Sequence, residues 1–367
     1  MIARFLTSDD LAGLVDFWQR NGRSGVVDVA SWQRRWSHNG IMAEAGPPLP
    51  IGWVLETKEG RIVGHLGNLA LLYDFRGRRL RAAAASDWHV EPAQRTASLQ
   101  LLSRFFGQSD VALFLNAFAT DVASKAWMAF GGRKVPSPGS DDPLFRIIKY
   151  AAFGQSVFRR KGWPMAGLFG ALAGGALRAG DAVGTLAGRR RTAVGVTVRA
   201  AGEFDARFDD FWARLRRESE RLLLVRERKH LDWHFKDFLA TQRGWITVCE
   251  RDGGMAGYAV FVRKDNREIG VSRAWVADLQ AVGPDQEPVL RTLLAAGAEE
   301  CRRRGIHMIE AVGFSAGKRE AIRTIFPRQR RFAQWPFLYR ARDAVLAEGL
   351  AQPAVWDVCI MDGADAL

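Results

Sequence analysis

The sequence predicts an α/β protein made of two tandem copies of one domain, each with a mixed central sheet flanked by helices. The first observation is size, because 367 residues with 48% hydrophobic and 25% charged side chains suit two compact globular cores. The second is an internal repeat. GWVLETKEGRIVGH begins at Gly52 and GWITVCERDGGMAGY begins at Gly244, and each has two apolar strands joined by a turn that contains glycine. Both segments predict a β-hairpin, and their similarity predicts a duplicated fold.

A second pair of segments recurs at almost the same separation along the chain. Asp87 in AASDWHV and Asp278 in WVADLQAV each lie in a strand-like run that precedes a proline and then a Leu-rich helical pattern. A looser third match pairs WQRRWSHN, which holds Trp32 and Trp36, with HLDWHFKD around Trp233, each upstream of its hairpin. Two matches at one separation are hard to obtain from unrelated segments, so they support the repeat.

Hydrophobic periodicity predicts the remaining elements of each half. The expected elements are, in chain order, a helix over about 95–106, a strand over 111–115, a helix over about 121–130, a helix over about 288–304 and a strand over 306–312. Each half then has the order hairpin, strand, helix, strand, helix. This order is typical of an α/β domain with mixed strand pairing and differs from a doubly wound nucleotide-binding fold.

The halves are expected to be joined by a basic, Gly- and Ala-rich connector. The predicted boundaries are 1–150 for the first domain, 151–192 for the connector and 193–367 for the second domain. The apolar stretch 163–177 is too short to span a bilayer, which needs about 20 residues, and is expected to form a helix docked on one domain. An alternative is that the arginines of 159–191 hold this segment on an anionic membrane surface.

The net positive charge of the chain favours negatively charged binding partners. Lys and Arg number 53 against 40 Asp and Glu, and a formal net charge of +13 attracts phosphates, acidic glycans or anionic lipids. The basic stretches GRRRTAVGVTVR and FPRQRRF lie in no recognisable nucleic-acid-binding module, so no specific nucleic acid is expected as partner.

The cysteines predict a reducing compartment. Cys249, Cys301 and Cys359 are odd in number and lack the paired spacing of a zinc ribbon, so neither a disulfide framework nor such a zinc site is encoded. The first residues, MIARFLTSDDLAGLVDFWQR, carry acidic side chains where a signal peptide needs its apolar region. A cytoplasmic protein is therefore expected.

Two histidines have the spacing of metal ligands on one helix face. His230 and His234 stand at i and i+4, but no carboxylate follows the first histidine as in a metalloprotease helix, and Lys229 lies beside it. No metal is therefore expected.

The segment HVEPAQRTASLQLL, from His89 to Leu102, resembles the signature of GNAT acyltransferases, in which a strand is followed by a basic residue and small residues that open a helix. The resemblance implies two tandem GNAT-like (acyl-CoA N-acyltransferase) domains, with acetyl-CoA or another acyl-CoA as co-substrate. A helix N-terminus offers unpaired backbone N–H groups and a positive dipole end to a pyrophosphate. The residues that the resemblance assigns to coenzyme A are Val90, Arg95, Thr96, Ala97, Ser98 and Asn116.

The match is incomplete, and it is confined to the first half. Gln100 stands where the signature has its second small residue. The comparable stretch of the second half, AVGPDQEPVL, has no basic residue, and its Asp285 and Glu287 would repel a phosphate. We therefore expect the second half to be a degenerate copy that shapes an acceptor groove or the contact between the halves.

Transfer of an acyl group to an amine needs a proton acceptor and a group that protonates the leaving thiolate. Asp87, His89 and Glu91 alternate along a predicted strand, so all three could face the thioester, and Asp87 or His89 could relay the proton. An alternative is that Asp87 makes a structural hydrogen bond and that His89 is a core or surface residue. Trp127 stands where many GNAT enzymes have a tyrosine acid.

The order of elements resembles two-copy GNAT proteins of bacterial polysaccharide and related biosynthetic loci. That resemblance implies N-acylation of an amine, with an amino sugar or polysaccharide precursor as an example. A competing hypothesis is a catalytically silent tandem fold that binds a glycan, a lipid or a protein, because Gln100 and Trp127 depart from the family pattern.

Overall fold

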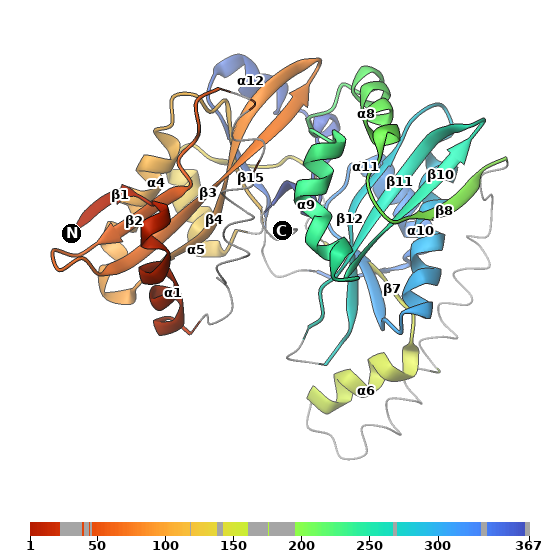
Figure 1. The fold of residues 1–367 in the computed structure, drawn as a ribbon, viewed down its shortest axis with the longest axis horizontal. Helices are drawn as coiled ribbons and strands as arrows, with labels where there is room; N and C mark the ends of the chain where they lie inside the picture. Colours follow the sequence, from red (N-terminus) through yellow and green to blue (C-terminus); the bar gives the residue numbers. More distant parts are fainter. Residues whose placement is uncertain are drawn as a thin grey trace.

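In the computed structural model, two β-sheets with their helices lie side by side (Figure 1). The structure describes residues 1–22, 39, 44, 46–117, 119–137, 142–160, 175, 195–266, 270–331 and 336–363. Trp32, Trp36 and almost all of the predicted connector helix 163–177 lie outside these residues.

The first sheet contains the first predicted hairpin. Its strands are, in spatial order, β1 (Ile2–Phe5), β2 (Gly52–Glu56), β3 (Ile62–Phe75), β4 (Arg78–Val90), β5 (Leu113–Asn116), β15 (Leu338–Ala341) and β6 (Arg133–Lys134), with β9 (Leu223–Leu224) paired to β3. Helix α1 (Leu11–Arg20) lies on one face, and α4 (Ser98–Phe106) and α5 (Asp121–Ala129) lie on the other. The apolar residues of α4 recur at helical spacing and are buried, so packing on the sheet stabilises this helix.

The second sheet repeats this layout. Its strands are, in spatial order, β8 (Thr197–Ala201), β10 (Gly244–Arg251), β11 (Gly254–Arg263), β12 (Arg273–Ala281), β13 (Met308–Ala311), β7 (Leu144–Ile147) and β14 (Arg328–Gln329). Helices α8 (Ala206–Glu218) and α9 (Arg228–Ala240) cover one face, and α10 (Gln286–Arg303) and α11 (Ala316–Ile325) cover the other. Two further helices, α6 (Tyr150–Arg160) and α12 (Ala344–Gly349), lie outside the repeat.

The two sheets exchange one strand each, at corresponding positions. Strand β15, late in the chain, lies between β5 and β6 of the first sheet, with Leu338 paired to Asn116. Strand β7, from the first part of the chain, lies between β13 and β14 of the second sheet, with Ile147 paired to Met308. The expected domain boundaries at 150 and 193 remain a prediction. Each sheet nevertheless contains one strand from the other side of these boundaries.

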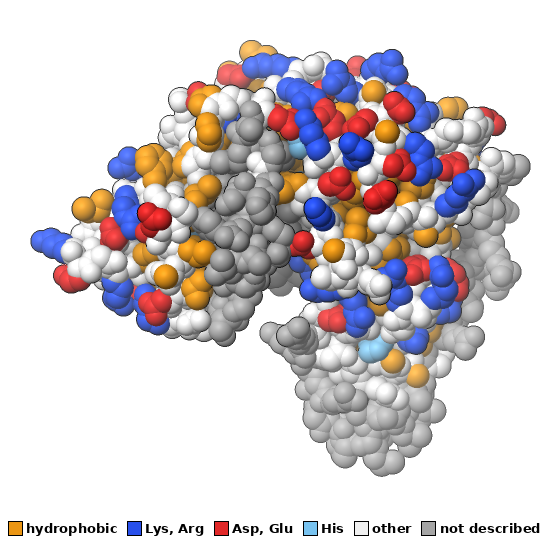
Figure 2. All heavy atoms as spheres, viewed as in Figure 1, with side chains coloured by type: hydrophobic (Ala, Val, Ile, Leu, Met, Phe, Trp, Pro, Cys, Tyr) orange, Lys and Arg blue, Asp and Glu red, His pale blue; other side chains and the backbone are white. Residues whose placement is uncertain are grey.

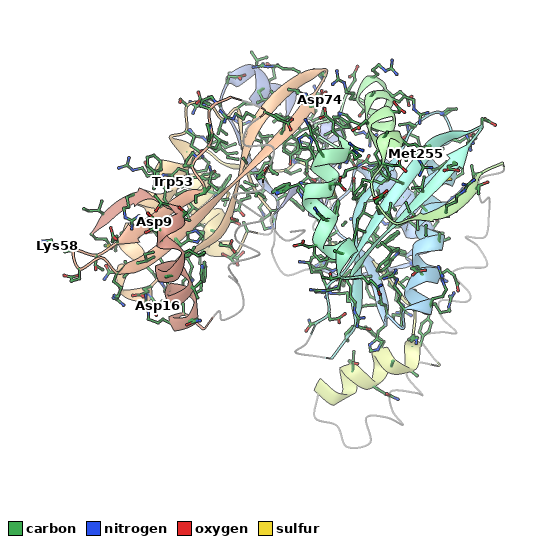
Figure 3. All side chains as sticks on the ribbon, viewed as in Figure 1. Asp9, Asp16, Trp53, Lys58, Asp74 and Met255 are labelled. Atoms are coloured by element: carbon green, nitrogen blue, oxygen red, sulfur yellow. The ribbon has the colours of Figure 1, made fainter. Side chains whose placement is uncertain are left out.

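The seam between the sheets is a continuous part of the core. The β3–β4 hairpin reaches towards the second half, and Asp74, labelled near its tip in Figure 3, pairs with Leu223 of β9. Tyr73 beside it is buried, and one cluster of buried apolar side chains includes residues of both sheets. Asp362, near the end of the described chain, contacts Tyr73 of β3.

The surface carries both signs of charge. Figure 2 shows Lys and Arg side chains interspersed with Asp and Glu over the second half. Within the part of the chain that the structure describes, no helix combines the length and the apolar character needed to cross a bilayer.

Candidate active site

Strands β4 and β5 of the first sheet part beyond a short paired stretch, and the unpaired region between them is called the first opening below. The two strands pair in parallel only from Ala82 to Ala84 of β4 and from Leu113 to Leu115 of β5, while β4 continues to Val90. A β-bulge marks the region beyond the pairing, because Asp87 and Trp88 together oppose a single residue of β3. A bulge bends its strand and increases the local twist, which helps β4 to turn away from β5.

The bulge changes the geometry of the three predicted catalytic residues. Asp87 has a φ of 50°, so the regular alternation of side chains is interrupted there. His89 and Glu91 lie beyond the bulge and do share a face. The Nε2 atom of His89 is 3.0 Å from Oδ1 of Asn21, which follows α1. Glu91 forms ion pairs with Arg20 of α1 and with Arg61.

His89 also lies against aromatic rings of α1. Its ring centroid is 5.7 Å from that of Phe17 and 5.6 Å from that of Trp18. His65, opposite His89 on β3, is buried and contacts Trp18 edge-on at 5.8 Å. The half-buried ring of His89 therefore lies between the sheet at β4 and helix α1.

The predicted phosphate turn begins as a 3₁₀ helix and not as the α-helix expected from residue 95. Residues Pro92–Ala97 form this 3₁₀ turn, and α4 starts at Ser98, whose Oγ donates to the backbone oxygen of Arg95 at 2.6 Å. Arg95 and Thr96 are exposed, whereas Val90 and Ala97 are buried. The side chain of Arg95 is therefore accessible beside a helix N-terminus.

The structure also places Asn116 and Gln100, the two remaining residues of the sequence comparison. Asn116 is the last residue of β5 and has 9% of its surface exposed, with β15 on its other side. Gln100, which departs from the signature, lies on the first turn of α4 and is exposed.

Strands β12 and β13 of the second sheet part in the same way, which defines the second opening, and a lysine binds the unpaired end of β12 there. Strands β12 and β13 pair from Arg273 to Trp275 and from Met308 to Glu310, and β12 continues to Ala281. The ammonium of Lys318, on α11, donates to the backbone oxygen of Leu279 at 2.6 Å. It also donates to Oε1 of Gln280 at 2.7 Å and to Oδ2 of Asp357 at 2.5 Å.

The ion pair of Lys318 and Asp357 is buried, and both burial and neighbouring charges shift the pKa values of its two groups. Burial lowers the pKa of Lys318, while the carboxylate of Asp357 opposes this shift. Burial would raise the pKa of Asp357, but Lys318 and the nearby guanidinium of Arg221 lower it to about 2. Asp357 is therefore a carboxylate at neutral pH.

The C-terminal segment, Trp356–Gly363, runs from this opening to the first sheet. Backbone N–H groups of Phe314 and Ser315 donate to the Val358 carbonyl and the Asp357 carboxylate, at 2.5 and 3.1 Å. At its other end, Asp362 accepts a hydrogen bond of 2.6 Å from the hydroxyl of Tyr73 on β3. The segment thereby contacts the second opening and the first sheet together.

A second buried ion pair lies beside the C-terminal segment. Arg226 donates to both oxygens of Asp278, at 2.9 and 3.1 Å, and Tyr258 donates to one of them at 2.6 Å. Burial opposes ionisation of Asp278, but the guanidinium of Arg226 makes the net pKa shift downward. The repeat identified Asp278 as the counterpart of Asp87. Neither the repeat nor the GNAT-like signature includes Arg226 or Lys318.

One signal for Lys318 was present in the sequence. It stands in AGKREAIRTI, where Ala321 and Ile322, three and four residues on, are buried. A charged residue on the apolar face of a helix indicates a buried partner. Counted from the start of the helix, the third residue of α5 is Ala123, which has a methyl group and no charge where α11 has Lys318.

Comparisons with known proteins identify the fold. No family model and no curated protein matches the sequence. Among solved structures, the chain is similar to a GCN5-related N-acetyltransferase from Kribbella flavida, at 14% identity over 94% of this chain and 72% of that one, with a TM-score of 0.54. A probable N-acyltransferase from Enterococcus faecalis gives 11% identity, 93% and 72% coverage and a TM-score of 0.55.

A third similar structure is the N-myristoyltransferase of Saccharomyces cerevisiae with bound myristoyl-CoA, at 11% identity, 93% and 83% coverage and a TM-score of 0.54. Likeness at these identities shows the fold. The predicted fold class, two tandem GNAT-like domains with mixed sheets flanked by helices, is confirmed.

Proposed function

We propose that the protein is an N-acyltransferase that moves an acyl group, with acetyl as the first choice, from acyl-CoA to an amine. The acyl-CoA binds in the first half only, with its pyrophosphate at the turn before α4 and its pantetheine arm between β4 and β5. The acceptor is an amine such as that of an amino sugar or a polysaccharide precursor.

The difference between the two openings carries this proposal. In the second half, Lys318 binds the backbone oxygen of Leu279 inside the opening, whereas Ala123 is its counterpart in the first half. The turns differ as well. Asp285 precedes α10 and pairs with Arg251 at 3.0 Å, while exposed Arg95 precedes α4. A phosphate is attracted to the turn that carries Arg95, in the first half, and repelled by the turn that carries Asp285, in the second half.

The chemistry requires little of the protein beyond orientation and one proton acceptor. The amine nitrogen attacks the thioester carbonyl, the carbon–sulfur bond breaks, and the amine proton passes to His89, directly or through a water. Glu91 is held by Arg20 and Arg61, which favours an orienting role for it. Trp127 is buried among the aromatic residues of α4 and cannot donate a proton to sulfur, so the thiolate leaves without an acid at that position.

Substitution of Arg95 tests where coenzyme A binds. Arg95→Glu should weaken acetyl-CoA binding by about 1–3 kcal/mol, because it removes a charge-assisted contact and installs a repulsive charge. Asp285→Ala changes the corresponding turn of the second half and should leave the affinity nearly unchanged. Isothermal titration calorimetry measures both. Equal effects of the two substitutions, or none from Arg95→Glu, would contradict binding in the first half.

A binding module without catalysis is the second candidate, favoured by Gln100 and Trp127. The two candidates differ in thiol release. An enzyme should release coenzyme A from acetyl-CoA in the presence of an amine panel, and His89→Gln should lower the turnover number while acetyl-CoA affinity stays the same. Binding of acetyl-CoA without amine-dependent thiol release would favour the module.

We also propose a cytoplasmic location. Cys249, Cys301 and Cys359 are free thiols and all three are buried, which supports a reducing compartment. Peripheral contact of residues 159–191 with an anionic membrane is a further proposal that vesicle flotation can test.

A further inference from the structure

Two carboxylates and an imidazole meet where the first half contacts the start of α9. Glu44, Glu227 and His230 each offer one ligand atom, and these atoms all lie within 4.8 Å of one another. Oε2 of Glu44 is 3.4 Å from Nε2 of His230, and Oε2 of Glu227 is 3.9 Å from its Nδ1. Ligand atoms about 2.0–2.2 Å from a tetrahedral metal ion are separated by about 3.3 Å from each other, which is close to the first of these distances.

The imidazole of His230 lies buried in this cluster without a hydrogen bond. Only 2% of the residue is exposed, and neither ring nitrogen has a hydrogen-bond partner among the described residues. Burying an unsatisfied polar group costs free energy, so a ligand that uses one of the nitrogens is favoured.

Cations on the outer side of the cluster orient both carboxylates. Oε1 of Glu227 pairs with Arg79 on β4, while its Oε2 faces His230. In the same way, Oε1 of Glu44 is 2.7 Å from the ammonium of Lys229, while its Oε2 faces His230. Each carboxylate therefore keeps one oxygen directed at the imidazole.

Lys229 is the movable member of the cluster. Its ammonium also lies 3.4 Å from Glu227, so it contacts both carboxylates, yet 56% of its side chain is exposed. A long, exposed lysine can swing into solvent with little loss of packing. It therefore acts as a cation that another cation can replace.

We propose that Glu44, Glu227 and His230 form a binding site for a divalent first-row transition metal ion, with Zn²⁺ as the best fit, and that Lys229 occupies its place when the metal is absent. One imidazole and two carboxylates are N and O ligands of the kind Zn²⁺ takes, and three protein ligands leave a fourth position for water. Glu227 and Lys229 also line a cleft of about 390 Å³, so this side of the proposed site borders solvent.

The proposed site joins elements of both halves. Glu44 precedes β2 of the first sheet, and His230 belongs to α9 of the second half. A bound ion would therefore link the halves and raise the melting temperature of the full-length chain. His234, one turn further along α9, is buried too but is not part of the cluster.

Zn²⁺ titration of the chelator-treated, full-length protein tests the proposal. We expect one equivalent to bind the wild type, at least a tenfold weaker affinity in both Glu44→Gln and Glu227→Gln, and a severalfold tighter affinity in Lys229→Met. Asp232→Asn is the matched control, because Asp232 is a carboxylate on the same helix outside the cluster, and it should bind as the wild type does. Both glutamine variants alter partly exposed side chains, so they should fold even if a His230 variant does not.

Co²⁺ provides a second readout. Its visible absorption should intensify on binding to the wild type, as expected when hexaaqua Co²⁺ becomes four- or five-coordinate. The proposal is overturned if the wild type binds no Zn²⁺, if Glu227→Gln binds it with unchanged affinity, or if Lys229→Met binds it no more tightly than the wild type.

Discussion

At the scale of single residues, the Asp357 carboxylate is expected to contribute strongly to the stability of the folded chain. It accepts from Lys318 and from the backbone of Ser315, and all of these contacts lie at the second opening. Asp357→Asn would leave the Lys318 ammonium buried without a counter-charge. We expect the free energy of unfolding to fall by about 3–5 kcal/mol, the usual cost of breaking a buried ion pair.

Urea unfolding measures this loss, and an exposed ion pair provides the control. Asp285→Asn removes the partner of Arg251 at the surface and should cost about 0–1 kcal/mol. Similar losses in the two variants would show that the buried pair contributes no more than a surface one.

The same carboxylate should make stability depend on acid. Its pKa of about 2 in the folded chain lies below the ordinary value of about 3.9, so its contribution to stability is complete above about pH 5 and is lost progressively as the pH falls towards 2. This shift corresponds to about 2–3 kcal/mol. Urea titrations at pH 5, 4 and 3 should show the decline, and Asp357→Asn should show a shallower one. A parallel decline in both proteins would assign the acid sensitivity to other groups, such as Asp278.

Single-residue contacts were predictable from the sequence only where they are local. The alternation of His89 and Glu91 predicted their shared face, and the repeat located Asp278. The bulge at Asp87 depends on how β4 lines up with β3, which no residue of β4 encodes by itself. The partner of Lys318, Asp357, belongs to the C-terminal segment. Helical periodicity can therefore show that Lys318 is a buried charge, but it cannot identify Asp357 as its partner.

At the scale of elements, the turn after β13 depends on a glycine. Gly313 has a φ of 86°, and a Cβ at this position would lie 2.3 Å from the Val358 carbonyl oxygen. Gly313→Ala should lower the free energy of unfolding by more than the roughly 1–2 kcal/mol that a left-handed backbone alone costs, because the C-terminal segment must also move.

Gly253 isolates the backbone contribution to that loss. It has a φ of 78° in the turn between β10 and β11, and an added Cβ would meet nothing within 4 Å. Gly253→Ala should therefore show only the conformational cost. Thermal or urea unfolding compares the two variants, and equal losses would mean that contact with the C-terminal segment contributes nothing.

Helices and hairpins of both halves were predictable because their signals lie within the element. The hairpins at Gly52 and Gly244 and the helices α5 and α10 appear where periodicity indicates them, within one or two residues. Strands β7 and β15 could not be assigned to their sheets in this way. Their sequences, LFRI and LYRA, are short and similar in pattern, so only the tertiary fold decides which edge each one joins.

At the scale of the whole molecule, the strand exchange predicts that the halves depend on each other. A fragment of residues 1–192 lacks β15, and a fragment of residues 193–367 lacks β7, so each has an unpaired sheet edge. We expect each fragment alone to aggregate or to lack near-ultraviolet circular dichroism, and co-expression of both to restore a soluble complex. Size-exclusion chromatography measures the outcome. A soluble, cooperatively folded monomer of either fragment would contradict this dependence.

The exchange also sets a timetable for folding on the ribosome. Strand β5 leaves the exit tunnel long before β15, its neighbour in the sheet, has been translated. At about 5–20 residues per second, the edge formed by Phe114 and Leu115 would wait on the order of 10–40 seconds for its partner. During that interval the nascent chain presents an apolar strand edge to every other polypeptide nearby. Chaperone occupancy of nascent chains should therefore persist until the last strand of the gene product emerges, and synonymous codons that slow the second half should lower the soluble yield.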